Sequence, residues 1–227
     1  MYREYLTARS PIRMLEKGLH GGLGAGNLGV VLAGHGVGKS SFLVGMALDS
    51  LLRDQKVLHV GLDQTVAHVR DYYDTVFEAF ATESNLEDAA TVHAEADRNR
   101  SIRVYASEGF HVGKLREALD LEEQTGAKPS VVILDGAESL AATDVKALRE
   151  LAGEHGLELW LAVAGSEEAV AGLPERLEAA SDHVSVLLAL EPGSDAVALR
   201  ALKDHDNPDV SALHVALDPR SLLLIRN

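Results

Sequence analysis

The feature that most constrains this fold is a glycine-rich segment between an apolar run and a helical pattern. It follows the apolar residues 28–32 and precedes residues 41–48, whose apolar side chains recur at helical spacing. A strand, a tight turn and a helix in direct succession are typical of an α/β protein. The segment reads Ala33-Gly34-His35-Gly36-Val37-Gly38-Lys39-Ser40.

The residue types in this segment match a phosphate-binding loop, or P-loop. Gly34, Gly36 and Gly38 tolerate backbone conformations that let successive N–H groups surround an anion. The helix that follows adds its positive N-terminal end. Lys39 is expected to reach the β- and γ-phosphates of a nucleotide, and the Ser40 hydroxyl to ligate Mg²⁺. The alternative is a glycine-rich turn with an exposed lysine and no ligand.

Residues 34–41, which are the loop after Ala33 and the first residue beyond it, are therefore predicted to contact the nucleotide. Ala33 stands where the strict pattern has glycine, and its small side chain is expected to fit the turn. His35 holds a variable position, where an exposed side chain is the alternative to phosphate contact. The predicted nucleotide-binding residues are Gly34, His35, Gly36, Val37, Gly38, Lys39, Ser40 and Ser41.

The composition excludes several classes of partner. The formal net charge is -14 and aromatic residues make up 4% of the chain, so neither the basic stripe nor the stacking platform of a nucleic-acid-binding protein is expected. The absence of cysteine excludes disulfides and thiolate metal sites. No apolar run reaches the ~18 residues of a membrane span, and the first residues lack a signal-peptide pattern. A cytoplasmic location without membrane contact is therefore expected.

Alternating apolar runs and helical patterns extend the β/α order. Strands are predicted at residues 56–62, 101–105, 131–135 and 157–164, with helices at 65–83, 85–98, 112–124, 143–155 and 174–180. Four later runs, at 183–190, 196–202, 213–217 and 222–225, have no room for helices between them and are expected to be antiparallel. The prediction is a single domain of residues 1–227, with a mostly parallel central sheet flanked by helices and an antiparallel C-terminal extension.

A second chemical position lies at the end of the 131–135 strand. Asp135 follows four apolar residues, a pattern that holds the Mg²⁺ water shell in P-loop enzymes. Because ligands of open α/β sheets bind at the carboxyl ends of strands, Asp135 is expected to face the loop, and the predicted metal ligands are Ser40 and Asp135. The alternative for Asp135 is an ordinary turn residue. Glu138 is a candidate general base, although a solvated turn residue is preferred, and His59 is expected to be a satisfied core residue.

Four segments in this order resemble one family. They are the glycine-rich residues 21–27, the loop at 33–40, the strand with an acidic end at 56–64, and the 131–135 strand. Together they are similar to the RecA-like P-loop ATPases, in particular the KaiC and DnaB-helicase branch. The antiparallel end is also similar, so the resemblance covers most of the chain and implies a RecA-like P-loop NTPase fold with ATP and Mg²⁺ as cofactors.

Two positions depart from that family. Its second strand typically ends in a glutamate that activates the attacking water, where this chain has Asp63 followed by a glutamine. Its late Lys-x-Arg acts on the ATP of a neighbouring subunit, where this chain has Lys203 and His205. Asp is shorter than Glu, and His lacks the guanidinium fork, so slow hydrolysis is expected with binding retained. The resemblance implies as catalytic residues Lys39, Asp63, Lys203 and His205.

The resemblance implies an ATP-binding domain whose weak hydrolysis is coupled to self-assembly, head to tail or in a ring, or to a protein partner. A non-catalytic nucleotide-responsive regulatory module is the main alternative. A small-molecule kinase is disfavoured, because Arg98, Arg100 and Arg103 form only a weak cluster for a second substrate. The net charge disfavours a recombinase or helicase.

Overall fold

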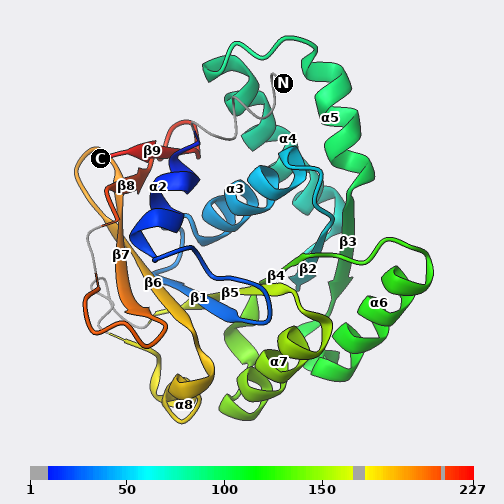
Figure 1. The fold of residues 1–227 in the computed structure, drawn as a ribbon, viewed down its shortest axis with the longest axis vertical. Coiled ribbons are helices and arrows are strands. Elements are labelled where there is room, and N and C mark those ends of the chain that lie inside the picture. Colours follow the sequence, from blue (N-terminus) through cyan, green and yellow to red (C-terminus); the bar gives the residue numbers. More distant parts are fainter. Residues whose placement is uncertain (1–9, 166–171, 211–212) are drawn as a thin grey trace.

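The computed structural model describes residues 10–165, 172–210 and 213–227. The strands of these residues form one nine-stranded sheet in the order β3-β2-β4-β5-β1-β6-β7-β8-β9 (Figure 1). The first six strands in that order are parallel, and the last three are added antiparallel. The strands are β1 (Leu28–Ala33), β2 (Val57–Leu62), β3 (Arg100–Tyr105), β4 (Val131–Asp135), β5 (Glu158–Ala164), β6 (Val186–Pro192), β7 (Val197–Asp204), β8 (Val215–Leu217) and β9 (Leu224–Arg226).

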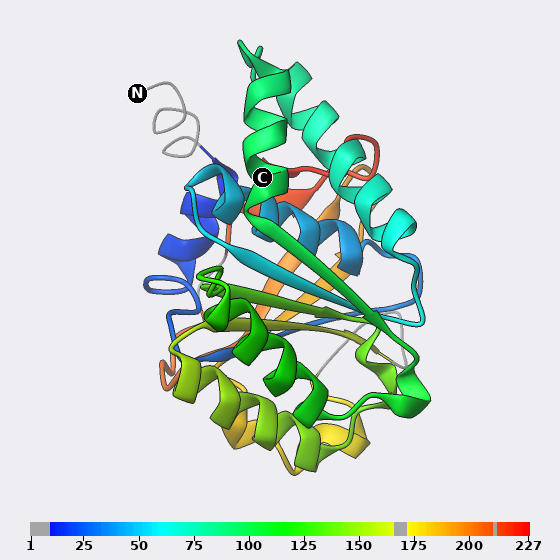
Figure 2. The ribbon, with the colours of Figure 1, turned by 90° about the vertical axis from the view of Figure 1, so that its right-hand side faces the viewer.

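Helices cover both faces of the sheet and make three layers (Figure 2). One apolar core joins the sheet to α2, α3, α4 and α5, and another joins it to α6, α7 and α8. The α-helices are α2 (Pro11–Gly18), α3 (Lys39–Leu52), α4 (Val66–Glu83), α5 (Ala89–Arg98), α6 (Val112–Gln124), α7 (Ala142–His155) and α8 (Glu175–Glu178), and the 3₁₀ turns are η1 (Ser107–Gly109), η2 (Ala137–Ser139) and η3 (Ser181–His183).

The parallel strands form the centre of the molecule because they are apolar throughout. Every residue of β1, β2 and β4 is buried, as expected for strands covered on both faces. Gly29 of β1 lies in register with Trp160 of β5, and a methyl group at Gly29 would come within 2.5 Å of the indole ring. Glycine at this position therefore lets the largest core side chain lie flat against β1.

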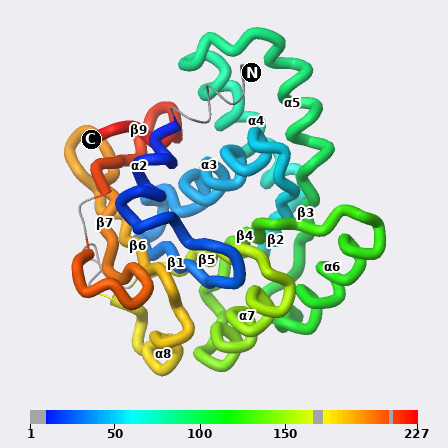
Figure 3. The backbone as a smooth tube through the Cα atoms, in the orientation of Figure 1, coloured from blue at the N-terminus to red at the C-terminus, as the bar shows by residue number. Residues whose placement is uncertain are grey.

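The two ends of the described chain lie side by side. Helix α2, near the start of the described chain, contacts strands β8 and β9 near the end of the chain (Figure 3). Ile12 and Leu15 of α2 share a core with Leu217 and Leu224 of the two short strands. The antiparallel extension is thus fastened to the parallel part through α2 as well as through β6.

The predicted α/β architecture is confirmed, with one correction at the strand after α8. β6 begins at Val186 rather than residue 183, and it pairs with β1 in parallel register as well as with β7 in antiparallel register. The chain leaves β5 on one side of β1, passes through α8 and returns as β6 on the other side. That crossover makes β6 the last parallel strand, so the antiparallel extension begins only at β7.

Two helix starts also differ from the sequence prediction. Helix α5 begins at Ala89, four residues later than predicted. Helix α7 begins at Ala142, one residue earlier than predicted, and the Asp144 carboxylate accepts a hydrogen bond from the Ala141 N–H at 2.9 Å. A carboxylate in the first helical turn satisfies an amide there and also suits the helix dipole.

Within the described residues, no helix has both the length and the apolar composition needed to cross a membrane.

Candidate nucleotide-binding site

The glycine-rich loop connects β1 to α3 at the carboxyl edge of the parallel sheet. Gly36 and Gly38 have φ values of 75° and 115°, a region that side chains other than glycine rarely adopt. Gly38 is the N-cap of α3, and no side chain among the described residues caps this helix. The N–H of Phe42 donates the first helical bond to the Gly38 carbonyl at 2.9 Å. The amides of residues 39–41 precede that ladder and are the groups with which a helix end binds anions.

Lys39 lies folded along this loop. Its Nζ donates to the carbonyl oxygens of Ala33 at 3.2 Å and Gly34 at 3.1 Å. Burial lowers the pKa of Lys39, while the negative charges of Glu138 and Asp135 act in the opposite direction. The lysine therefore sits half-buried between the loop and two carboxylates, the surroundings in which a bound anion would compensate its charge.

Asp135 lies at the end of β4, on the same edge of the sheet as the loop. β5 alone separates β4 from β1, so the two strand ends lie ~10 Å apart at about 4.8 Å per strand. The side chain is buried, and its Oδ2 accepts a hydrogen bond from Gln64 Nε2 at 3.1 Å. Ser40 and Asp135 line one small cavity of about 10 Å³. The structure thus brings together the two residues predicted as metal ligands.

The turn after Asp135 is held tightly against the end of β2. Gly136 has a φ of 84°, and a methyl group on it would lie 2.7 Å from the Leu62 carbonyl oxygen. Glycine is therefore required here for both conformation and space. The close contact fixes the direction in which the chain leaves β4 and, with it, the position of the Asp135 carboxylate.

The structure does not bring Asp63 into this group. Asp63 is exposed, has a φ of 55°, and accepts a hydrogen bond at Oδ1 from the Ser107 N–H at 2.9 Å. Hydrogen bonds from the hydroxyl and the backbone of Ser107 hold the pKa of this carboxyl below its usual range. Its neighbour Gln64 reaches Asp135 instead. The sequence pattern singles out Asp63, the first residue after β2. Because Asp63 adopts a left-handed backbone conformation, the next residue, Gln64, reaches the site instead.

Lys203 and His205 are engaged within the chain. Lys203 Nζ donates to the Ser181 carbonyl at 2.8 Å. His205 Nε2 donates to the Leu23 carbonyl at 3.0 Å, and its Nδ1 lies 2.9 Å from Asp204 Oδ1. Both side chains therefore fasten the end of β7 to neighbouring segments of the same molecule.

Asp204 is the centre of that fastening. It is 1% exposed, and its second oxygen lies 2.5 Å from His20 Nδ1 and accepts from Asn207 Nδ2 at 3.1 Å. Burial alone would raise the pKa of Asp204, but hydrogen bonds from His205, His20 and Asn207 outweigh it and lower the pKa. This buried carboxylate with several donors is a structural joint between β7 and the turn after α2.

Glu138 was expected to be a solvated turn residue, and it is exposed on η2. Its charge nevertheless has the largest effect among those that raise the pKa of Lys39. The exposed Glu138 therefore faces the loop. Of the remaining loop residues, His35 is exposed and Ser41 is buried.

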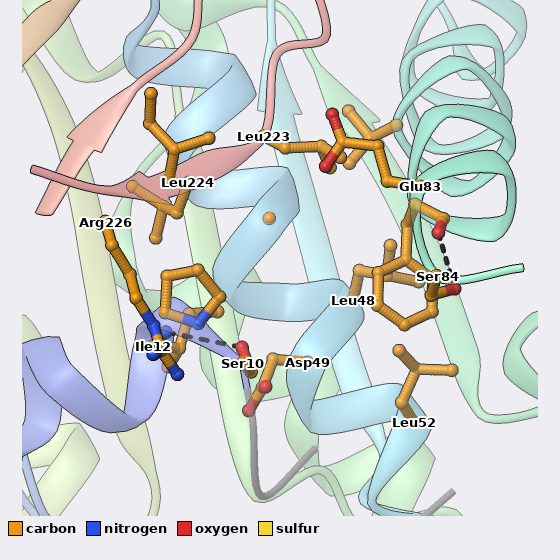
Figure 4. A pocket seen from close by; sticks show the side chains of 15 residues that line it. Ser10, Ile12, Leu48, Asp49, Leu52, Glu83, Ser84, Leu223, Leu224 and Arg226 are labelled. Atoms are coloured by element: carbon orange, nitrogen blue, oxygen red, sulfur yellow. Dashed lines mark hydrogen bonds between the residues drawn. The ribbon is translucent and has the colours of Figure 1, made fainter. Parts of the chain in front are cut away.

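A larger cavity of about 470 Å³ lies farther along α3, between α2, α4 and β9 (Figure 4). Its lining is mainly apolar, and the buried carboxylate in its wall, Asp49, is paired with Arg13 and with Arg53 at 3.1 Å. The start of α2 lines it, but Pro11 has no N–H and the Ile12 N–H donates to Ser10 Oγ at 3.3 Å, whereas the loop at the other end of α3 offers uncapped amides, a lysine and a carboxylate together. The large cavity has the greater volume, but the chemical groups of the loop are better suited to an anion.

A comparison with models of known protein families finds none that matches this chain, and a comparison with curated protein sequences finds no match either. The residues of the site are therefore the basis for proposing a function.

Proposed function

We propose that this chain is a RecA-like P-loop NTPase domain that binds Mg-ATP at residues 33–41. One observation carries the proposal: Ser40 and Asp135 line one cavity beside a lysine-bearing loop that ends in an uncapped helix N-terminus. Amides and Lys39 suit phosphate oxygens, while a hydroxyl and a carboxylate suit Mg²⁺. A glycine-rich turn without a ligand explains none of this convergence.

In this proposal each residue has a defined task. Backbone amides of the loop and of Ser41 bind the phosphates, and Lys39 leaves its carbonyl partners to contact the terminal phosphates. Ser40 and Asp135 would hold Mg²⁺, which neutralises phosphate charge when bound. Gln64 orients the Asp135 carboxylate through its hydrogen bond.

The proposed hydrolysis is slow. Asp63 is hydrogen-bonded to Ser107, and His205 to Leu23 and Asp204, so neither is free in this conformation to act on a γ-phosphate. A missing arginine finger alone lowers turnover by ~10³–10⁵-fold where one operates. This observation also favours the second candidate, a non-catalytic nucleotide-responsive regulatory module. Steady-state phosphate release in Mg-ATP separates the two, since the module releases none above the Lys39→Ala background.

Self-association remains part of the proposal. Lys203 and His205 would reach the nucleotide of a neighbouring subunit only after their contacts with Ser181 and Leu23 break. Sedimentation with and without Mg-ATP tests this coupling. A species that stays monomeric at high protein concentration in both conditions removes assembly from the proposal and leaves regulation through a protein partner.

The binding proposal is tested by thermal unfolding with Mg-ATP. A ligand that binds only the folded state stabilises it by ~2.7 kcal/mol at a hundredfold excess over its Kd. The wild type should shift to higher temperature, and Lys39→Ala should shift much less at the same Mg-ATP concentration, while both unfold alike without nucleotide. An equal shift in the variant would remove the loop as the binding site.

A further inference from the structure

His59 is a buried polar residue directly beneath the candidate site. It lies in the middle of β2 and is 1% exposed. It pairs in register with Ile133 of β4, and Gly61, two residues on, pairs with Asp135. Because residues two apart in a strand share a face, His59 lies on the same face of the sheet as Asp135, one step below it.

One ring nitrogen of His59 has a partner and the other does not. Nδ1 lies 3.2 Å from the hydroxyl of Tyr73 on α4, whose ring in turn lies 4.3 Å from the Arg100 guanidinium. Nε2 is buried and has no hydrogen-bond partner among the described residues. The sequence predicted a satisfied core histidine, and that is wrong for this atom. An unsatisfied buried polar atom costs about 1–3 kcal/mol, a cost that an apolar residue here would avoid.

The small cavity between loop and sheet supplies the missing partner. His59 lines it together with Ser40, Gln64 and Asp135, whereas Tyr73 does not. Nε2 is the ring nitrogen without a partner in the described part of the chain, so it is the one available to a group in the cavity. The volume of about 10 Å³ matches one water molecule, and a buried water needs two to four polar partners. Four of the eight lining residues, namely Ser40, His59, Gln64 and Asp135, provide them.

The contact with Tyr73 decides which ring nitrogen of His59 carries the proton. Burial lowers the pKa of His59 to about 4, although the charge of Asp135 acts in the opposite direction. The ring is thus neutral near pH 7 and carries one proton. When the Tyr73 hydroxyl donates to Nδ1, the proton is on Nε2, and the nearby carboxylate of Asp135 favours that arrangement.

We propose that His59 is a positioning residue of the nucleotide site, whose Nε2–H donates to one buried water that in turn donates to Asp135. Gln64 holds the carboxylate from one side, and the His59-bound water holds it from below, leaving its remaining lone pairs for the Mg²⁺ shell. This inference rests on the proposed function. Partners of this kind set ligand orientation, and removing one typically costs 10–100-fold in metal affinity.

The first test compares nucleotide binding with and without metal. We expect His59→Leu to raise the Mg²⁺ concentration for half-maximal ATP binding by about tenfold and to leave binding in excess chelator unchanged. Ile133→Val, a trimmed apolar neighbour in the same layer, should change neither value. A His59→Leu protein with wild-type Mg²⁺ dependence overturns the inference alone. A wild type that binds no ATP in either condition overturns the proposed function and this inference with it.

The second test needs no nucleotide and no substitution of His59 itself. Nitrogen NMR of the wild-type histidines reports which nitrogen of His59 carries the proton, and a Tyr73→Phe comparison identifies the signal. The expected result is a neutral ring protonated at Nε2, with a proton protected from solvent exchange. A ring protonated at Nδ1 donates toward Tyr73 and not into the cavity, which would overturn the inference even if His59→Leu failed to fold.

Discussion

The sequence points to charged residues in two regions where strands end, and these residues have different surroundings in the structure. At the ends of β1 and β4, Lys39, Ser40 and Asp135 lie around one crevice, with amides of a helix N-terminus beside them. At the end of β7, Lys203 and His205 are bound to backbone carbonyls and to the buried Asp204. The polar groups at the ends of β1 and β4 surround a cavity, whereas those at the end of β7 are hydrogen-bonded within the protein.

The contrast separates binding from structural roles. A group that is available to a ligand still has unused hydrogen-bonding capacity. Examples are the uncapped amides of α3 and Nε2 of His59, which has no partner among the described residues. A group with a structural role has its hydrogen-bonding capacity already used within the protein, as Asp204 does with His20, His205 and Asn207. Satisfied buried polar groups rigidify a fold, and unsatisfied ones call for an explanation.

The largest expected effect comes from exchanging the two lysines in turn for alanine. Lys39→Ala should weaken Mg-ATP binding by roughly 10–100-fold, because a hydrogen bond to a charged group is worth about 1.5–3 kcal/mol. Lys203→Ala is the matched control and should bind as the wild type does. Equilibrium dialysis with labelled ATP measures both, and equal losses in the two variants would erase the distinction between the two strand ends.

The reverse comparison uses Asp204. Asp204→Asn should lower the free energy of unfolding by about 2 kcal/mol, because it weakens several hydrogen bonds to a buried carboxylate. Mg-ATP affinity of the folded variant should not change. Asp206→Asn, exposed and two residues on, should leave stability unaltered. Urea unfolding measures the difference, and a loss of ATP affinity in Asp204→Asn would place the β7 end within the site.

The two regions should also differ in how their contributions to stability depend on pH. The pKa of His59 is lowered to about 4 from 6.5, so above 6.5 neither state gains a proton there. Between pH 6.5 and 4 the unfolded chain binds a proton at His59 that the folded chain does not. As the pH decreases through this range, the free energy of unfolding therefore falls by up to about 1.4 kcal/mol per pH unit. The pKa of Asp204 is lowered from 3.8, so its contribution is present above that value and is lost only as the pH falls further.

The measurement is urea unfolding across pH 4–7 for the wild type and His59→Gln. The groups that act on His59 are Tyr73, Arg100 and Asp135, and all remain in the variant. The slope between pH 6.5 and 4 should shrink in His59→Gln and persist in Asp204→Asn. If the slope disappears in Asp204→Asn instead, the pH dependence comes from Asp204 and not from His59, which contradicts this prediction.

The smallest effect concerns the large cavity. Gly45 lines it in the middle of α3, and a methyl group there meets no atom within 4 Å. Gly45→Ala should stabilise the fold by roughly 0.5–1 kcal/mol through helix propensity. It should leave Mg-ATP affinity unchanged, as thermal unfolding and dialysis will report. A changed affinity would mean that this cavity and the loop communicate along α3.

Local signals predicted the parts of the fold and site that depend on neighbouring residues. The β1–loop–α3 unit follows from spacing and glycines within 25 residues, and Asp135 from four apolar residues before it. The choice of Gln64 over Asp63 depends on a left-handed turn, which a residue pattern does not specify. The Asp204 joint depends on contacts between residues more than 180 positions apart, and the parallel pairing of β6 depends on a crossover.

Calorimetric titration of the wild type with Mg-ATP, and separately with adenosine, tests the central claim most directly. The loop offers groups for phosphate rather than for the base. We therefore expect saturable binding of one Mg-ATP per chain and far weaker binding of adenosine. No saturable binding of Mg-ATP at millimolar concentration, or equal affinity for adenosine, would contradict it.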